Sequence, residues 1–214
     1  MSENTIYVAF DLETGGLVPS QADILTGWFG FFDKDFKLLD ELPLKLKPDN
    51  GRLPMADAGA LKVNGINIKE HLEDSETVTY SEGKKLLLEK AQKYLKRNGK
   101  FSNLIPTGFN IIGFDIKMIN EHLVDAETWN KFFHYKNLDV MNATDFLRFC
   151  GWIPSDTSRL TQLADYFGVA QGTAHTAKFD TLMTIELLKK LKELMDSKKS
   201  GGQAVDLISL LEAE

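Results

Sequence analysis

The sequence is poor in cysteine, in net positive charge and in long apolar runs. Cys150 is the single cysteine among 214 residues, which excludes an internal disulfide framework and fits a reducing compartment. No apolar run approaches the length of a membrane span. Residues 1–5 lack the basic and apolar regions of a signal peptide. We therefore expect a cytoplasmic protein with no membrane partner.

The net charge of −6 gives the chain no overall basic character. This balance argues against a protein that coats nucleic acid by charge alone. It does not exclude an enzyme that contacts a few phosphates through metal ions, because the carboxylate ligands of such ions make a metal-free protein more negative.

Length and composition indicate one globular domain with a short C-terminal extension. The chain is 43% hydrophobic and 26% charged, and 214 residues can bury one sizeable core. We expect the domain to cover residues 1–196, and residues 197–214 to form a flexible linker and a short amphipathic tail. Apolar residues of the tail, such as Leu207, Ile208 and Leu211, either fold back on the domain or bind a partner.

The apolar pattern predicts strands first and mostly helices afterwards. Expected strands cover residues 6–11, 23–33, 36–47 and 103–109. Expected helices cover residues 56–63, 81–97 with Ser81 as N-cap, 116–123, 139–150, a segment capped by Thr157 or Ser158, and 177–195. This order indicates an α/β protein with a mixed sheet flanked by helices.

Two acidic residues follow the first predicted strand at alternate positions. Side chains two apart on a strand point to the same face, so Asp11 and Glu13 would be like charges side by side at the end of a buried strand. Such a pair is unfavourable unless a cation lies between them, and hard divalent cations prefer carboxylate oxygens. A short acidic pattern also arises by chance and is then merely solvated. Gly15 and Gly16 allow a turn there and the close approach of another backbone.

Two later stretches carry acidic residues that can reach the same place. Asp115 follows a predicted strand and a turn, and ligand sites of α/β sheets lie beyond the carboxyl ends of strands. His175 and Asp180 would be about 140° apart around a single helix. They converge only if His175 lies on a loop and Asp180 lies in the first turns of the helix that follows.

Three stretches together resemble the exonuclease motifs of the DEDDh family. They are Phe10-Asp11-Leu12-Glu13-Thr14-Gly15, Gly108-Phe109-Asn110 with Phe114-Asp115, and His175-x-Ala177-x-x-Asp180. The family belongs to the ribonuclease-H-like superfamily and includes the proofreading subunit of bacterial DNA polymerase III, ribonuclease T and oligoribonuclease. The resemblance spans residues 5–195 and implies a ribonuclease-H-like sheet, with three antiparallel strands at the start followed by parallel strands.

The chain departs from the family pattern at two positions. The first motif usually has a second threonine where this chain has Gly15, and the second motif often has histidine where this chain has Phe109. Neither change removes a carboxylate. Both positions are expected where the substrate passes, so they bear on substrate preference more than on chemistry.

The resemblance implies a metal site and a general base. Two Mg²⁺ or Mn²⁺ ions would be held by four carboxylates, those of Asp11, Glu13, Asp115 and Asp180. Asp11 would bridge both ions, and Asp115 would act mostly through water. His175 would be the general base, since an unperturbed histidine titrates near neutral pH.

The resemblance also implies the substrate contacts. The backbone of Glu13, Thr14 and Gly15 would hold the 3′-hydroxyl and sugar of the terminal nucleotide. Leu17 would wedge against the last base. Further candidates in the second motif are Phe109, Asn110 and Phe114, whose rings stack on bases or else belong to the core.

The activity implied is 3′→5′ hydrolysis of single-stranded DNA ends, with release of nucleoside 5′-monophosphates. RNA ends or short oligoribonucleotides are the alternative substrates. A non-catalytic, polymerase-associated module of the same fold is the alternative from a different class. If the amphipathic tail binds a partner and does not fold back on the domain, we expect that partner to be a polymerase or a replication factor.

Overall fold

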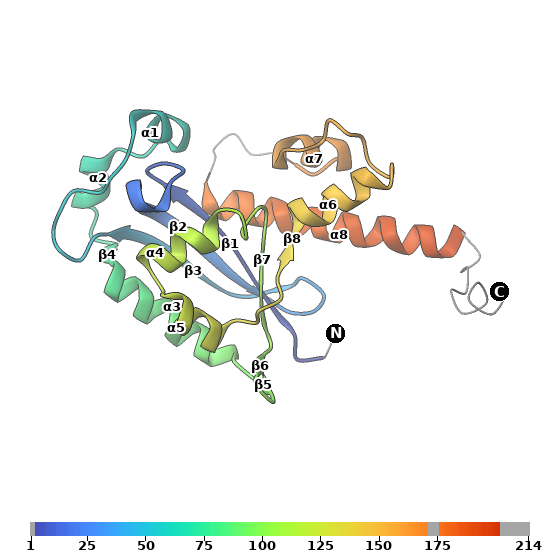
Figure 1. The fold of residues 1–214 in the computed structure, drawn as a ribbon, viewed down its shortest axis with the longest axis horizontal. Coiled ribbons are helices and arrows are strands. Elements are labelled where there is room, and N and C mark those ends of the chain that lie inside the picture. Colours follow the sequence, from blue (N-terminus) through green and yellow to red (C-terminus); the bar gives the residue numbers. More distant parts are fainter. Residues whose placement is uncertain (1–2, 171–175, 202–214) are drawn as a thin grey trace.

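The computed structural model describes residues 3–170 and 176–201, and a six-stranded sheet forms their centre (Figure 1). The strands lie in the order β4-β3-β2-β1-β7-β8. Their bounds are β1 Ile6–Thr14, β2 Ile24–Phe32, β3 Leu38–Lys47, β4 Thr77–Thr79, β7 Leu104–Gly108 and β8 Leu138–Asp139. None of the described helices combines the length and apolar character that a bilayer crossing requires.

The strand directions match the predicted mixed sheet. β1 pairs with β2 and β2 pairs with β3 in antiparallel directions, whereas β1–β7, β7–β8 and β3–β4 are parallel pairs. The α/β fold class and the antiparallel start expected from the sequence are confirmed. β1 lies in the interior of the sheet, and its carboxyl end lies beside that of β7.

Helices cover both faces of the sheet, and the alternation of β1 divides the core accordingly. Val8, Phe10 and Leu12 belong to a buried cluster shared with α3 (Tyr80–Tyr94), α4 (Asp115–His122) and α5 (Ala126–Phe132). Tyr7 and Ala9 belong to a second cluster shared with α6 (Val140–Phe149), α7 (Leu160–Phe167) and α8 (Ala177–Gly201). Because the side-chain period of a strand is two, every odd residue of β1 faces the α8 side.

Smaller elements complete the described chain. They are the 3₁₀ turn η1 (Pro19–Gln21), α1 (Ala58–Asn64), α2 (Ile68–Glu73) and a hairpin of β5 (Arg97–Asn98) and β6 (Phe101–Ser102). α1 and α2 lie at the end of the sheet where β1 finishes, and the hairpin lies at the other end (Figure 1).

Several helix boundaries differ from the expectations, among them the end of α3, which lies at Tyr94 because Arg97 and Asn98 form β5. α3 is capped by Thr79, not Ser81, because Thr79 and Glu82 form a reciprocal capping box. The N-cap of α7 is Arg159, not Thr157 or Ser158. α8 continues to Gly201, through part of the expected linker, since no glycine or proline interrupts it earlier. The tail proper, residues 202–214, lies outside the described residues.

A fully buried carboxylate anchors the segment that follows β3. Asp23 is 0% exposed and accepts hydrogen bonds from Arg52 Nη1 at 2.5 Å, Arg52 Nη2 at 2.9 Å and Met55 N at 2.6 Å. Tyr80 Oη adds a bond at 3.1 Å. Burial alone would raise the pKa of Asp23, but these donors outweigh it and hold the pKa below its usual value. The network ties residues 52–55 to the start of β2.

Replacing Arg52 with glutamine should lower the free energy of unfolding by about 2–3 kcal/mol, because Asp23 would keep its burial and lose its charged donor. Lys34→Gln breaks an exposed pair with Asp35 and should leave the stability unchanged. Urea denaturation of both variants measures the difference. Equal stability of the two variants would contradict the anchoring role of Arg52.

Candidate active site

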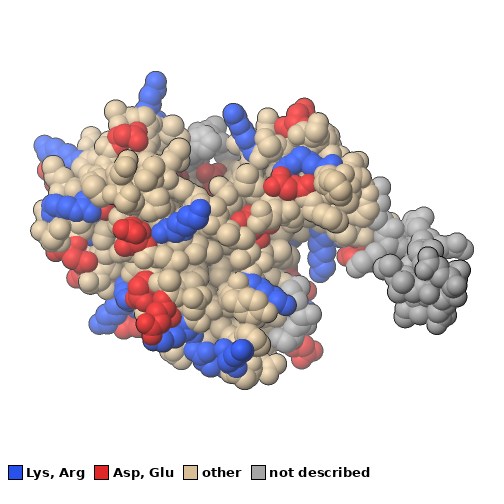
Figure 2. Space-filling model, in the orientation of Figure 1, with Lys and Arg blue, Asp and Glu red and all other residues tan. Residues whose placement is uncertain are grey.

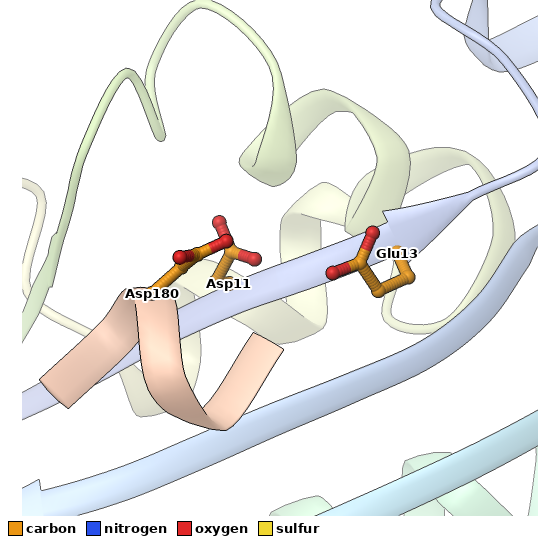
Figure 3. A group of neighbouring side chains, drawn as sticks. All are labelled: Asp11, Glu13 and Asp180. Carbon is orange, nitrogen blue, oxygen red and sulfur yellow. The ribbon is translucent and has the colours of Figure 1, made fainter. Parts of the chain in front are cut away.

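The carboxyl end of β1 brings three carboxylates together. Asp11 and Glu13 are odd residues of β1 and therefore lie on its α8 side, and Asp180 lies in the first turn of α8. One oxygen from each of the three lies within 4.8 Å of the others. Figure 3 shows Asp11 and Glu13 rising from the strand and Asp180 reaching them from the helix. The convergence predicted from the sequence is present.

The start of α8 sets the position of Asp180. Thr176 stands before the helix, where its Oγ1 accepts from Phe179 N at 3.3 Å and its carbonyl accepts from Asp180 N at 3.0 Å. The inner side of the helix is buried through Ala177, Met183 and Leu187, which packs the helix on the sheet. A carboxylate in a first helical turn is also favoured by the positive end of the helix dipole.

Asp115 supplies a fourth carboxylate from the beginning of α4. It is 3% exposed, and its carboxylate accepts hydrogen bonds from its own N–H and from the Leu12 N–H. Leu12 lies between Asp11 and Glu13, so this bond fixes Asp115 beside the pair. Asp115 Oδ1 is buried, and among the described residues it has no hydrogen-bond partner. That open oxygen is unusual for a buried polar atom and is available to a cation.

The carboxylates shift one another's pKa upward. The pKa of Asp11 is raised well above its usual value. Burial is the largest cause, followed by the charges of Asp115, Glu13 and Asp180. The pKa of Glu13 is raised to about 7, mainly by burial and secondly by the charge of Asp180. Burial raises the pKa of Asp115 to about 8, although its two backbone hydrogen bonds oppose the shift. The site is therefore short of positive charge, which is the condition a divalent cation relieves.

The donor set suits a hard divalent ion. All four side chains offer carboxylate oxygens, the ligands that Mg²⁺ and Mn²⁺ prefer. The orphaned Asp115 Oδ1 and the raised pKa values both fit a group that is complete only with metal. Asp11, Glu13 and Asp180 would form the inner cluster, with Asp115 beside it.

Gly15 lets the segment after β3 pack against the end of β1. A Cβ at Gly15 would lie 2.1 Å from Met55 O and 2.7 Å from Ala56 Cα, so no side chain fits. Gly15 N donates to Asp23 O, and Asp57 N donates to Gly15 O, each at 2.8 Å. The predicted close approach of another backbone is confirmed. The side-chain direction of Gly15 is filled by protein, and the contact of its backbone with substrate stays a prediction.

A cavity of about 380 Å³ adjoins the carboxylates. Its lining includes Glu13, Thr14, Leu17 and Phe114, so it gathers most of the predicted substrate contacts of the first motif. Leu17 is 82% exposed and thus projects freely beside the cavity. Thr14 Oγ1 donates to Gly16 O at 2.8 Å, and Asn64 Nδ2 donates to Thr14 O at 3.2 Å, which fixes the turn.

Two predicted contacts of the second motif are not brought to this cavity. Phe109 is half-buried against the cluster under α6 and α8. Asn110 adopts a left-handed conformation, with φ of 60°, and its side chain lies against Gly113. Their contact with substrate stays a prediction. His175, the predicted base, lies outside the described residues.

Asp139 has a positioning role that the sequence did not reveal. It is 5% exposed and accepts hydrogen bonds from Asn110 N at 2.9 Å, Ile112 N at 3.2 Å and Met141 N at 3.0 Å. It caps α6 and at the same time holds the turn that leads to Asp115. An aspartate between a strand and a helix signals a cap, but its second set of partners is distant in sequence.

Solved structures of exonuclease I share this fold. The chain matches Escherichia coli exonuclease I with zinc and single-stranded DNA at a TM-score of 0.70 and 18% identity, over 90% of this chain and 42% of that one. It matches the same enzyme with a dT13 oligonucleotide at 0.65 and 19%, over 90% and 43%. It matches exonuclease I of Methylocaldum szegediense at 0.67 and 19%, over 88% and 40%.

The likeness is one of fold, and it confirms the fold class predicted from the sequence. The chain spans less than half the length of these exonuclease I chains. No family model matches the sequence, and no curated protein matches it either.

Metal-free protein should lose stability between pH 5 and pH 9. The folded pKa values of Asp11, Glu13 and Asp115 are raised, so their contribution is complete below the unfolded value near 4 and is lost as these groups ionise. In EDTA the melting temperature should fall by roughly 5 °C over this range. Mg²⁺ or Mn²⁺ should reverse the fall at pH 8, as measured by calorimetry.

Asp115→Asn removes one titrating group from the site and should flatten this pH dependence. A melting temperature in EDTA that rises from pH 5 to pH 9 would contradict the repulsion inferred for the cluster.

Proposed function

We propose that this chain is a metal-dependent 3′→5′ exonuclease that hydrolyses single-stranded DNA from its 3′ end and releases nucleoside 5′-monophosphates. The observation that carries the proposal is the convergence of Asp11, Glu13 and Asp180 at the end of β1, with Asp115 buried beside them. The exonuclease fold supports it, as do the single-stranded oligonucleotides bound to its structural neighbours.

Each carboxylate has an assigned task. Asp11, Glu13 and Asp180 would hold the divalent ions as the inner cluster, and Asp115 would complete the site through its open oxygen. Two bound Mg²⁺ or Mn²⁺ ions supply an activated water and offset the charge that develops on the leaving oxygen. His175 would accept the proton of the attacking water, since an unperturbed histidine titrates near neutral pH.

The cavity beside Glu13 would receive the terminal nucleotide. Its volume of about 380 Å³ lies within the range of small-molecule sites. The backbone of Glu13 and Thr14 would hold the 3′-hydroxyl, and Leu17 would press on the last base from its exposed position. The ring of Phe114, which also lines the cavity, would stack on a base.

Two other functions have weaker support. RNA ends would offer the same phosphates to the same carboxylates, so the substrate assay decides between the polymers. A non-catalytic module would have no need of four converging carboxylates, of which Asp11, Glu13 and Asp115 have pKa values raised by burial and by neighbouring charges. We also propose that residues 1–196 form the catalytic domain and that the tail contacts a polymerase or replication factor, as its apolar pattern suggests.

Asp11→Asn and Asp180→Asn should each reduce hydrolysis at least about 1,000-fold, because each removes a charge from the metal site. The assay follows 5′-labelled DNA and RNA oligonucleotides with Mg²⁺, and EDTA serves as a blank. Asp156→Asn changes an exposed aspartate and should leave the rate unchanged. A ladder that shrinks from the 3′ end supports the proposal. Binding without any ladder on either polymer would favour the non-catalytic module.

His175→Ala should leave a small residual activity, because the metal site remains and only the base is lost. This residual activity should increase at high pH, where hydroxide replaces the base. A pH–rate profile of the variant against the unmodified protein makes the measurement. Full activity of His175→Ala at neutral pH would exclude the assignment.

A further inference from the structure

A second cavity, of about 680 Å³, lies at the end of the sheet opposite the carboxylates. It is lined by residues from the beginning of β1 and β7, from the β5–β6 hairpin and from residues 134–138. We call it the basic cavity and define it by Lys96, Arg97, Phe101, His134 and Lys136. Figure 1 places the hairpin far from the start of α8, so this cavity is separate from the candidate active site.

The basic cavity has a charge opposite to that of the whole molecule. Three of its lining residues are Lys96, Arg97 and Lys136, and none of its described lining residues is Asp or Glu. Among the described residues these three cations form no ion pair, in a chain of net charge −6. Figure 2 shows several Lys and Arg side chains over the lower part of the molecule, with Asp and Glu side chains among them. Cations collected without counter-charges attract a polyanion.

Exposed rings stand beside these cations. Phe101 is 42% exposed and Tyr135 is 62% exposed, and the ring of His134 contacts both. The ring centres are 5.6 Å apart for Phe101–His134, 5.4 Å for Phe101–Tyr135 and 4.6 Å for His134–Tyr135. Lys100 Nζ and Lys136 Nζ lie over two of the rings, 5.4 Å and 5.9 Å from their centres. A solvent-facing aromatic cluster of this kind is a platform on which bases stack.

Backbone contacts hold the platform in place. Ser102 Oγ donates to Phe132 O at 2.6 Å, and the Arg97 guanidinium donates to Lys131 O. Lys136 N donates to His134 Nδ1 at 2.8 Å, so the proton of the neutral ring is on Nε2, available to a ligand. These bonds join the hairpin to the segment that carries His134 and Tyr135. A site ordered before binding loses little entropy when a ligand arrives.

We propose that the basic cavity is a second contact for single-stranded nucleic acid, with phosphates on Lys96, Arg97 and Lys136 and bases on Phe101 and Tyr135. A nucleic acid offers a phosphate and a flat base in every unit, which matches both features, whereas an acidic peptide matches only the charge. β1 spans the interval from Thr5 to Asp11, roughly 20 Å at about 3.3 Å per residue. A strand that keeps the base stacking of duplex DNA rises about 3.4 Å per nucleotide, so roughly six stacked nucleotides span this interval.

This second contact deepens the proposed function, because it would hold a long strand several nucleotides away from the reacting 3′ end. Direct binding in EDTA separates the two ideas, since it needs no hydrolysis. The probe is 5′-fluorescein-labelled dT20, and its anisotropy is measured with the full chain over a series of salt concentrations. Hydrolysis with Mg²⁺, measured separately, decides the proposed function alone.

The double variant Arg97→Ala/Lys136→Ala should weaken dT20 binding about tenfold and reduce the slope of log K against log salt by about 1.4, or 0.7 for each lost phosphate contact. Lys85→Ala/Lys190→Ala removes the same charge from exposed positions on α3 and α8 and should change neither quantity. Equal affinity and equal salt slope in all three proteins would overturn the proposal. So would full displacement of dT20 by an acidic peptide that binds the unmodified protein more tightly.

Crosslinking tests the same site without any substitution. A dT20 strand with 5-iodouracil at successive positions is irradiated with the unmodified protein in EDTA, and the attached peptide is sequenced. Crosslinks to Phe101, His134 or Tyr135 from positions about six nucleotides from the 3′ end support the proposal. Crosslinks confined to the residues around Asp11 and Phe114 would overturn it.

Discussion

The mutual repulsion of carboxylates at the end of β1 is the constraint on which the site depends. Strand geometry makes Asp11 and Glu13 share one face, and α8 covers that face and adds Asp180. Asp115 joins the group from the start of α4, where it accepts a hydrogen bond from the Leu12 N–H. Burial and the neighbouring charges raise the pKa values of Asp11, Glu13 and Asp115. The fold thus gathers negative charge that protonation or a bound cation relieves.

Other buried aspartates show that this gathering of negative charge is specific to the site. Asp23 is more completely buried than Asp115, yet Arg52 and two other donors keep its pKa low. Asp139 is also buried and accepts three backbone N–H groups. Where a carboxylate has a structural task, the chain supplies donors for it. Asp115 keeps a buried oxygen that no described group satisfies, which marks it for a ligand instead.

The same two aspartates hold the loops on either side of the site. Asp23 binds the segment that packs on Gly15, and Asp139 binds the turn that leads to Asp115. Both loops are therefore fixed from the core and not by the carboxylates themselves, which repel one another. At the far end of β1 the β5–β6 hairpin and residues 134–136 carry exposed rings and cations that form no ion pair with any described residue. One strand thus separates an acidic end that needs metal from a basic end that suits phosphate.

The sequence by itself determined the long elements, the mixed α/β sheet and the four carboxylates, because strong apolar periodicity and motif order are local properties of the chain. It missed α2, α5, β4 and β8, which are too short for a periodic signal, and it placed the cap of α3 two residues late. Only the tertiary structure decided that Met55 packs on Gly15, that Asp139 holds residues 110–112, and that Phe109 turns toward the core. Each of these depends on segments distant in sequence meeting in space, and no local pattern encodes such a contact.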